Sequence, residues 1–217
     1  NLPSTLTTMG DGIFAYDYAL KNVNFAANSQ ITSLPGTTFE GCTGLESITL
    51  PASLTEISGR IRDSYGLQGR GLFESLTALR TVNFEEGSKL TTIGNYAFAG
   101  SGLESIIIPN SVTTIGEYAF AYSDPYGTGT KLTTITIPRT VTSIGTQAFT
   151  RCENLESVYI DANITELPGY VFQSCVNLRL ISLPASLETI SSTAFVNCNN
   201  ITQFIVADGN EYYAVEE

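Results

Sequence analysis

The chain contains no histidine, and only 14% of its 217 residues are charged. Without histidine, Ser-His-Asp and Cys-His catalytic arrangements are excluded. The net charge of −11 disfavours a nucleic-acid partner, because phosphate neutralisation needs clustered Lys and Arg. It equally disfavours adhesion to an anionic membrane surface. No apolar stretch approaches the roughly 20 residues that span a bilayer, so the sequence predicts neither a hydrolase of these classes nor a transmembrane segment.

The four cysteines are few and regularly placed. Each lies three residues after a phenylalanine, at Cys42, Cys152, Cys175 and Cys198. A zinc site usually needs CxxC or CxxH pairs, and neither occurs. Disulfides need Cβ atoms about 3.8 Å apart, closer than the strand spacing of a parallel ladder. We therefore expect buried free thiols, no metal and no cofactor.

The phrase T-x-I-G-x-x-A-F recurs along the chain. Its phenylalanine occurs eight times, as Phe14, Phe39, Phe73, Phe98, Phe120, Phe149, Phe172 and Phe195. The successive steps are 25, 34, 25, 22, 29, 23 and 23 residues. A period of 20–29 residues is typical of a leucine-rich-repeat-like solenoid. The prediction is one domain, 1–217, of about eight repeats with insertions at 58–72 and 123–131.

The repeat at 90–109 shows how one coil is expected to fold. Ile106 and Ile108 follow the period-2 pattern of a half-buried strand, and Pro109 closes that strand. Ala97 and Phe98 are expected to fill a short helical or 3₁₀ corner. The fold class is thus an α/β-type repeat solenoid, mostly β and coil, with short parallel strands on a concave face. The inward strand pairs are Val23/Phe25, Ile48/Leu50, Val82/Phe84, Ile106/Ile108, Ile135/Ile137, Val158/Ile160, Ile181/Leu183 and Phe204/Val206, and the repeat phenylalanines form an aromatic spine.

The longer motif T-x-I-G-x-x-A-F-x-x-C-x-x-L-x-x-I-x-I-P is nearly complete at 142–160 and returns at 188–206. With this motif the chain resembles the BspA-like leucine-rich repeats of bacterial surface proteins. The resemblance implies a right-handed superhelix that is extracellular or attached to the cell surface. It also implies a binding scaffold, in some members an adhesin for host matrix proteins or other cells, and it supplies no catalytic residue. The chain departs from the family pattern at its two long steps.

Residues between the inward pairs should point out of the concave face. Most of them are small and polar, and the exceptions are Ile107, Tyr159, Leu180 and Ile205. An exposed tyrosine is a common binding anchor, and Tyr159, Leu180 and Ile205 are candidates for an apolar patch. The alternative is that scattered apolar surface residues have no function.

The insertions are the second set of candidates. The first, 58–72, carries Arg60, Arg62, Tyr65 and Arg70, and the second, 123–131, carries Tyr126. Insertions in solenoids map to loops and often to binding faces. Neutral drift is the alternative, because lengthening a loop costs little.

The sequence therefore predicts a non-catalytic cell-surface or secreted module for protein binding or adhesion. Its expected partner is a surface or matrix protein of a host or neighbouring cell, or a glycan. Two alternatives stay open: a carbohydrate-binding module, and a passive spacer within a larger surface protein. The first residues resemble the end of a repeat strand, so we expect a fragment of a longer protein.

Overall fold

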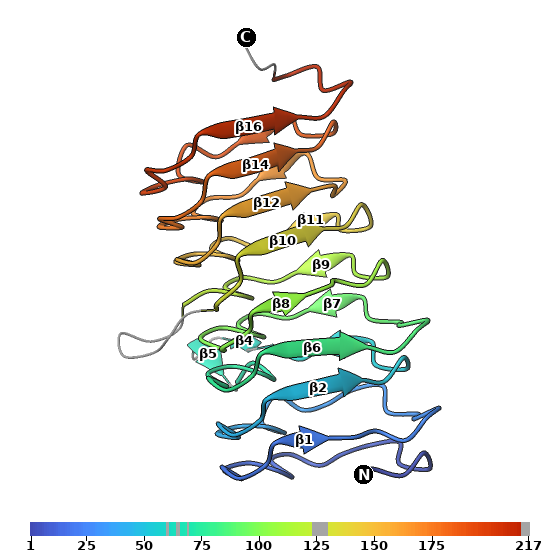
Figure 1. The fold of residues 1–217 in the computed structure, drawn as a ribbon. Helices are drawn as coiled ribbons and strands as arrows, with labels where there is room; N and C mark the ends of the chain where they lie inside the picture. Colours follow the sequence, from blue (N-terminus) through green and yellow to red (C-terminus); the bar gives the residue numbers. More distant parts are fainter. Residues whose placement is uncertain (60, 64–65, 69, 123–129, 214–217) are drawn as a thin grey trace.

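The computed structural model describes residues 1–59, 61–63, 66–68, 70–122 and 130–213; for 61–63 and 66–68 it describes the backbone alone. The chain coils into a column of about seven turns (Figure 1). The strands of the near side point one way, those of the far side point back, and the chain climbs from N to C as a right-handed coil. The predicted parallel-stranded solenoid is confirmed.

The near side of Figure 1, here called the front, carries eight described strands stacked one per coil. They form two parallel four-stranded sheets, β1-β2-β6-β8 and β10-β12-β14-β16. Their bounds are β1 Asn22–Val23, β2 Ser47–Leu50, β6 Thr81–Phe84, β8 Ser105–Ile106, β10 Thr134–Ile137, β12 Ser157–Ile160, β14 Leu180–Leu183 and β16 Gln203–Val206.

The back of the column carries shorter parallel strands. One sheet runs β3-β7-β9-β11 and a second pairs β13 with β15. Their bounds are β3 Glu56–Ile57, β7 Thr92–Ile93, β9 Thr114–Ile115, β11 Ser143–Ile144, β13 Glu166–Leu167 and β15 Thr189–Ile190. Threonine hydroxyls reinforce this side: Thr91 Oγ1 donates to the Thr55 carbonyl (3.0 Å) and Thr113 Oγ1 to the Thr91 carbonyl (3.2 Å).

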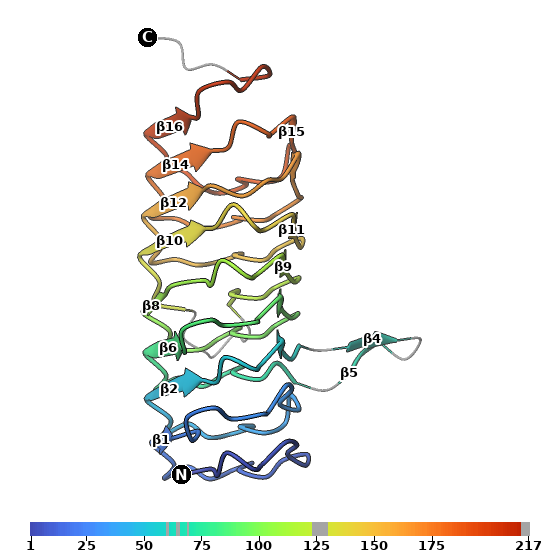
Figure 2. The same ribbon diagram turned by 90° about the vertical axis from the view of Figure 1, so that its right-hand side faces the viewer.

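The first insertion contains a hairpin that leaves the column. Strands β4 (Ile61–Asp63) and β5 (Gly66–Gln68) pair antiparallel. Figure 2 shows this hairpin projecting from the side opposite the front strands. The insertion therefore lies on a different face from the predicted strand-face residues.

The interior follows the repeat pattern. The inward residues of the front strands are buried or partly buried up to β14, whereas Phe204 in β16 is 38% exposed. The eight repeat phenylalanines form one continuous stack, with centroid separations of 5.1–5.9 Å and interplanar angles of 2–17°. The six rings from Phe39 to Phe172 are fully buried. The predicted aromatic spine is confirmed.

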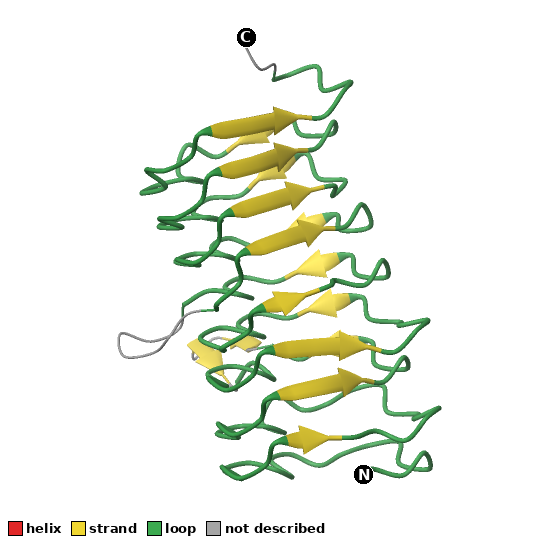
Figure 3. Cartoon of the chain, viewed as in Figure 1, coloured by secondary structure: helices red, strands yellow, loops and turns green. Residues whose placement is uncertain are grey.

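The corners around these rings differ from the prediction. Figure 3 shows strands and loops, and the described residues contain no helix, neither α nor 3₁₀. The backbone explains why: two residues before and after Phe98, Tyr96 and Gly100 have φ of 59° and 66°, which interrupts any helix. Their N–H groups donate instead to Glu117 and Ala121 of the next coil.

The cysteines are free, and all but the half-buried Cys198 are fully buried. Their thiols donate to phenylalanine carbonyls of the preceding coil, as in Cys42 Sγ to Phe14 O (2.9 Å) and Cys198 Sγ to Phe172 O (2.9 Å). They pack the corner, as predicted. Within the described ranges, no group of three His, Cys, Asp or Glu side chains is placed to hold a metal ion. None of the described residues forms a helix that could cross a membrane.

Candidate functional site

The outward side chains of the front strands form a surface that we call the strand face. It consists of the central column Asn24, Thr49, Asn83, Ile107, Thr136, Tyr159, Ser182 and Ile205, and the flanking column Asn22, Ser47, Thr81, Ser105, Thr134, Ser157, Leu180 and Gln203. All sixteen are exposed or half-buried. Strand alternation places them here, because the inward residues next to them in each strand fill the core.

The predicted apolar residues of this face are unequally exposed. Ile107 is 87% exposed, whereas Ile205 is 39% and Tyr159 37% exposed. Leu180 is half-buried. The register pairs Tyr159 with Ser182 and Ser182 with Ile205. Ser182 therefore separates Tyr159 from Ile205 in their column, so these two side chains are not adjacent.

Two grooves lie on this side of the column and share Ile106, Ile107 and Asn110 in their walls. The large groove, about 1130 Å³, runs past the ends of β10, β12 and β14, and the small groove, about 630 Å³, lies beside β6. Among the predicted apolar residues, Ile107 is the one that lines them. It stands as a ridge between the two hollows.

Residues just after the front strands also line the large groove, and the sequence analysis missed them. Asn110, Arg139, Asp161, Asn163 and Ser186 follow the segments that end β8, β10, β12 and β14. Their recurrence within three residues of the last inward residue of a front strand was the available signal, and Asn110 and Arg139 directly follow an Ile-Pro. Arg139 and Asp161 are exposed, and neither forms an ion pair with another described residue.

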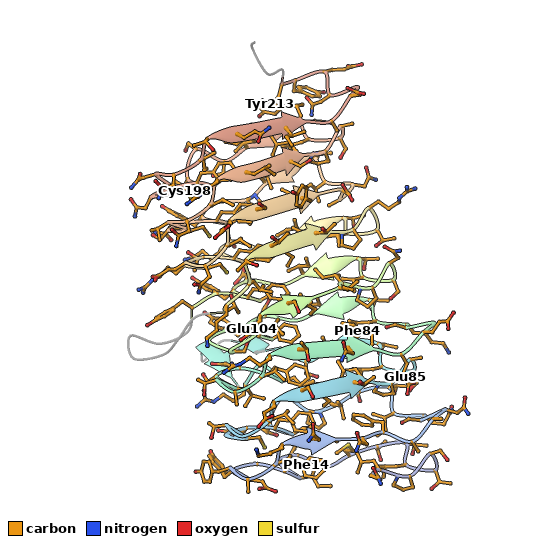
Figure 4. The ribbon with its side chains drawn as sticks, viewed as in Figure 1. Phe14, Phe84, Glu85, Glu104, Cys198 and Tyr213 are labelled. Atoms are coloured by element: carbon orange, nitrogen blue, oxygen red, sulfur yellow. The ribbon has the colours of Figure 1, made fainter. Side chains whose placement is uncertain are left out.

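Charged residues stack at the opposite end of the front strands. Lys21 Nζ lies 3.0 Å from Glu46 Oε1, and Arg80 Nε lies 3.1 Å from Glu104 Oε1. Figure 4 shows Glu104 at the start of the strands and Phe84 and Glu85 at their ends. The paired side chains are 40–68% exposed, so each pair stabilises the coil by about 1 kcal/mol at most.

The insertion candidates are only partly described. Arg60, Tyr65 and Tyr126 lie outside the described residues, as does the side chain of Arg62 in β4. Arg70 is described and lies near two carboxylates, 3.6 Å from Glu40 and 3.4 Å from the buried Glu74. These contacts give Arg70 a structural role at the base of the hairpin, while its role in binding stays a prediction.

A row of corner tyrosines was also missed. Tyr96 and Tyr118 stack with centroids 4.7 Å apart, and the Tyr118 hydroxyl donates to Gln147 Oε1. Tyr170 has the same place in its repeat and is 41% exposed, and Gln147 lies between it and Tyr118 in the column. Tyr96, Tyr118 and Tyr170 all have φ between 55° and 59°. Stacking covers the facing sides of the Tyr96 and Tyr118 rings.

Comparison with known proteins agrees with this architecture. A family model described as BspA type leucine rich repeat region (6 copies) matches residues 1–68 and 126–214. The chain is similar to a leucine-rich repeat protein from Bacteroides ovatus, with 27% identity, a TM-score of 0.68, and coverage of 87% of this chain and 45% of that one. It therefore spans less than half of that protein's crystallised length. No curated protein matches the chain.

Two further solved structures share the fold. A leucine-rich repeat protein from T. pallidum has 24% identity and a TM-score of 0.58 over 84% of this chain and 72% of that one. One from Eubacterium ventriosum has 21% identity and a TM-score of 0.50 over 74% of this chain and 48% of that one. These similarities bear on the fold alone.

Proposed function

Because the chain belongs to the BspA-type leucine-rich-repeat family, we propose that it is a non-catalytic protein-binding module that is secreted or displayed on a bacterial cell surface. The family is one of surface proteins, which supports the location. Its partner in this proposal is a surface or matrix protein of another cell, bound through the strand face.

The exposure of Ile107 carries the proposal. A large aliphatic side chain that is 87% exposed between two grooves contributes binding free energy when a partner removes it from water. The surrounding face is small and polar, as in the rims of protein interfaces. The Ile107 ridge and the polar strand face around it together resemble a protein interface with one apolar anchor residue.

The tyrosines favour a protein over a glycan. A glycan site would use exposed aromatic faces to cover the apolar face of a sugar ring. On the strand face, the aromatic side chain of the two outward columns is Tyr159, which is only 37% exposed; the more exposed Tyr16, Tyr18 and Tyr170 lie outside these columns. The exposed Ile107 side chain and the extended polar strand face offer the apolar and polar contacts that a protein surface uses.

Binding arrays test the proposal. The protein is applied to purified extracellular-matrix proteins and, separately, to glycans, as wild type, as Ile107→Ser and as Glu166→Ala, a control on the exposed back strand β13. We expect binding to at least one matrix protein that survives glycan competition and falls at least tenfold in Ile107→Ser but not in Glu166→Ala.

Three outcomes contradict the proposal. Binding that glycans abolish indicates a carbohydrate-binding module. A complete absence of binding indicates a spacer. Binding that Ile107→Ser leaves intact removes the strand face as the site.

A further inference from the structure

The front sheet is interrupted once between neighbouring described coils. Six coil-to-coil steps carry a hydrogen bond at the residue just before the strand, as in Arg80 N–H to Glu46 O (2.8 Å) and Glu104 N–H to Arg80 O (2.9 Å). At the step from Glu104 to Thr133, two described residues, this bond is missing. Lys131 N–H donates to Leu103 O instead (2.8 Å), so the register slips here.

The slip leaves two strand edges without a partner. Among the described residues, no ladder joins β8 to β10, and Ile107 belongs to no ladder at all. The carbonyls of Thr133 and Ile137 accept bonds from the β12 coil, so the alternate residues Thr134 and Thr136 direct their N–H and C=O groups toward β8. We call this gap between β8 and β10 the seam.

Side chains near the seam show the same mismatch. Ser53 and Ser186 donate their hydroxyls to carbonyls of the coil below, at 2.7 and 2.8 Å. The equivalent hydroxyl of Thr140, in the coil just above the seam, is buried and has no partner within the described structure. The back sheet, in contrast, pairs β7 with β9 and β9 with β11 without a break. The two coils are thus joined by a sheet at the back but by no ladder at the front, where the bond from Lys131 to Leu103 links them.

The geometry points to a specific occupant: we propose that the seam binds an extended polypeptide segment of a partner protein, which adds a strand between β8 and β10. Unpaired strand edges offer alternating N–H and C=O groups, and an extended backbone is the ligand that satisfies both. The ridge at Ile107 then receives an apolar side chain of the segment. This inference rests on the proposed function and names the form of the partner.

The charges of the groove fit the same occupant. Arg139 and Asp161 line the large groove with one charge of each sign and no ion pair among the described residues. A polypeptide segment that carries one basic and one acidic group complements both, whereas a polyanion complements only Arg139. A segment inserted between β8 and β10 needs two strand spacings between them, about 9.6 Å. Binding therefore widens the seam while the back strands of the two coils stay paired.

A synthetic peptide copying residues 131–138, Lys-Leu-Thr-Thr-Ile-Thr-Ile-Pro, is a suitable probe, because its strand is the kind that the front sheet pairs. It carries one amine side chain and a free terminal carboxylate. Its matched control is the same peptide N-methylated at both isoleucines, which keeps the side chains but removes alternate N–H donors. Binding is measured by fluorescence anisotropy with the folded full chain. Hydrogen exchange reports on the amides of Ile108, Thr134 and Thr136, which the strand alternation directs into the seam.

We expect the probe to bind, N-methylation to weaken it at least tenfold, and the three amides to become protected on binding. Ile107→Ser weakens binding at least tenfold, whereas Ile205→Ser, an equally conservative change on the same face but outside both grooves, changes it less than twofold. Absence of probe binding, equal binding of the methylated peptide, or equal effects of the two variants overturns the seam proposal. A matrix protein that still binds through Ile107 in that case leaves the proposed function standing.

Discussion

At the scale of single residues, the phenylalanine stack decides how the coils hold together. Each interior ring contacts the ring above and the ring below, so it carries packing between three coils. Phe149 lies 5.1 Å from Phe120 and 5.4 Å from Phe172, centroid to centroid, and is fully buried. A change at such a position removes two stacking contacts and leaves a cavity.

Phe149→Ala is therefore expected to lower the free energy of unfolding by about 3–5 kcal/mol. Urea denaturation followed by circular dichroism measures the change. Phe14→Ala is the control, because Phe14 stacks on one described neighbour and is partly exposed, and its effect should be clearly smaller. Equal losses at the two positions would show that the stack is not what joins the coils.

The cysteines at the same place in successive repeats affect each other's thiol pKa. Burial raises the pKa of the Cys175 thiol well above its ordinary value. The Cys175 thiol donates to the Phe149 carbonyl when Cys198 is protonated, and turning it toward the Cys198 thiolate lowers the pKa of Cys198. Burial also raises the pKa of Cys42, which lies in a coil without a neighbouring cysteine.

Below about pH 8, a larger fraction of Cys198 than of Cys42 is thus thiolate, the reactive form. Iodoacetamide should alkylate Cys198 first, as measured by peptide mass spectrometry over a pH series. Cys175→Ala removes the donor, raises the pKa of Cys198 and should slow its alkylation at neutral pH. An unchanged rate in that variant would contradict the assigned hydrogen bond.

At the scale of the repeated elements, glycines allow the coils to approach each other. A Cβ added at Gly116 would lie 2.7 Å from the backbone nitrogen of Asn95 and 2.8 Å from the carbonyl carbon of Gly94, both in the preceding coil. Real Cβ atoms do not approach backbone this closely, so the two coils would have to separate.

Gly116→Ala should consequently destabilise the fold by about 1–3 kcal/mol, the usual range for overpacking. Thermal unfolding measures it. Gly10→Ala is the matched control, since a Cβ there meets nothing within 4 Å. If both substitutions shift the melting temperature equally, close approach of the coils is not the cause.

The repeat pattern predicted most of these elements. The inward pairs, the stacked phenylalanines and the outward columns follow from period-2 alternation in strands and the 22–25-residue step. The corners could not be predicted as turns, because Tyr96 and Tyr118 occupy positive-φ positions where sequence alone favours glycine. The bonds that hold them there come from the next coil, which a local pattern does not show.

The candidate site was predicted only in part. Ile107 was identified because an isoleucine replaces the small polar residues usual in its column. The seam was not, since Ser105–Ile108 reads like any other repeat strand. The seam coincides with a register slip where Lys131 bonds to Leu103, a bond between two coils that a local pattern does not show. The grooves lie between coils and were equally hidden.

At the scale of the whole molecule, the two predicted sets of site residues lie on different sides of the column. The hairpin of β4 and β5 projects away from the strand face (Figure 2). One rigid partner surface of ordinary size does not reach both. An experiment can therefore treat them separately.

Replacing residues 60–69 with a short Gly-Ser linker should leave strand-face binding within twofold of wild type. It should also leave the melting temperature within a few degrees, because the hairpin projects away from the column (Figure 2). Binding to the same matrix-protein array, alongside Ile107→Ser, measures this. Lost binding in the linker variant alone would move the site to the hairpin.

The hydrogen bonds between coils run along the axis of the column, and this determines its response to tension. Pulling the two ends apart loads those bonds coil after coil, so the outermost coil detaches while the rest stay intact. Each detached coil of about 23 residues releases a tether of about 80 Å. A molecule held at one end and pulled at the other would therefore lengthen in steps, and each step would dissipate mechanical energy through the unfolding of one coil.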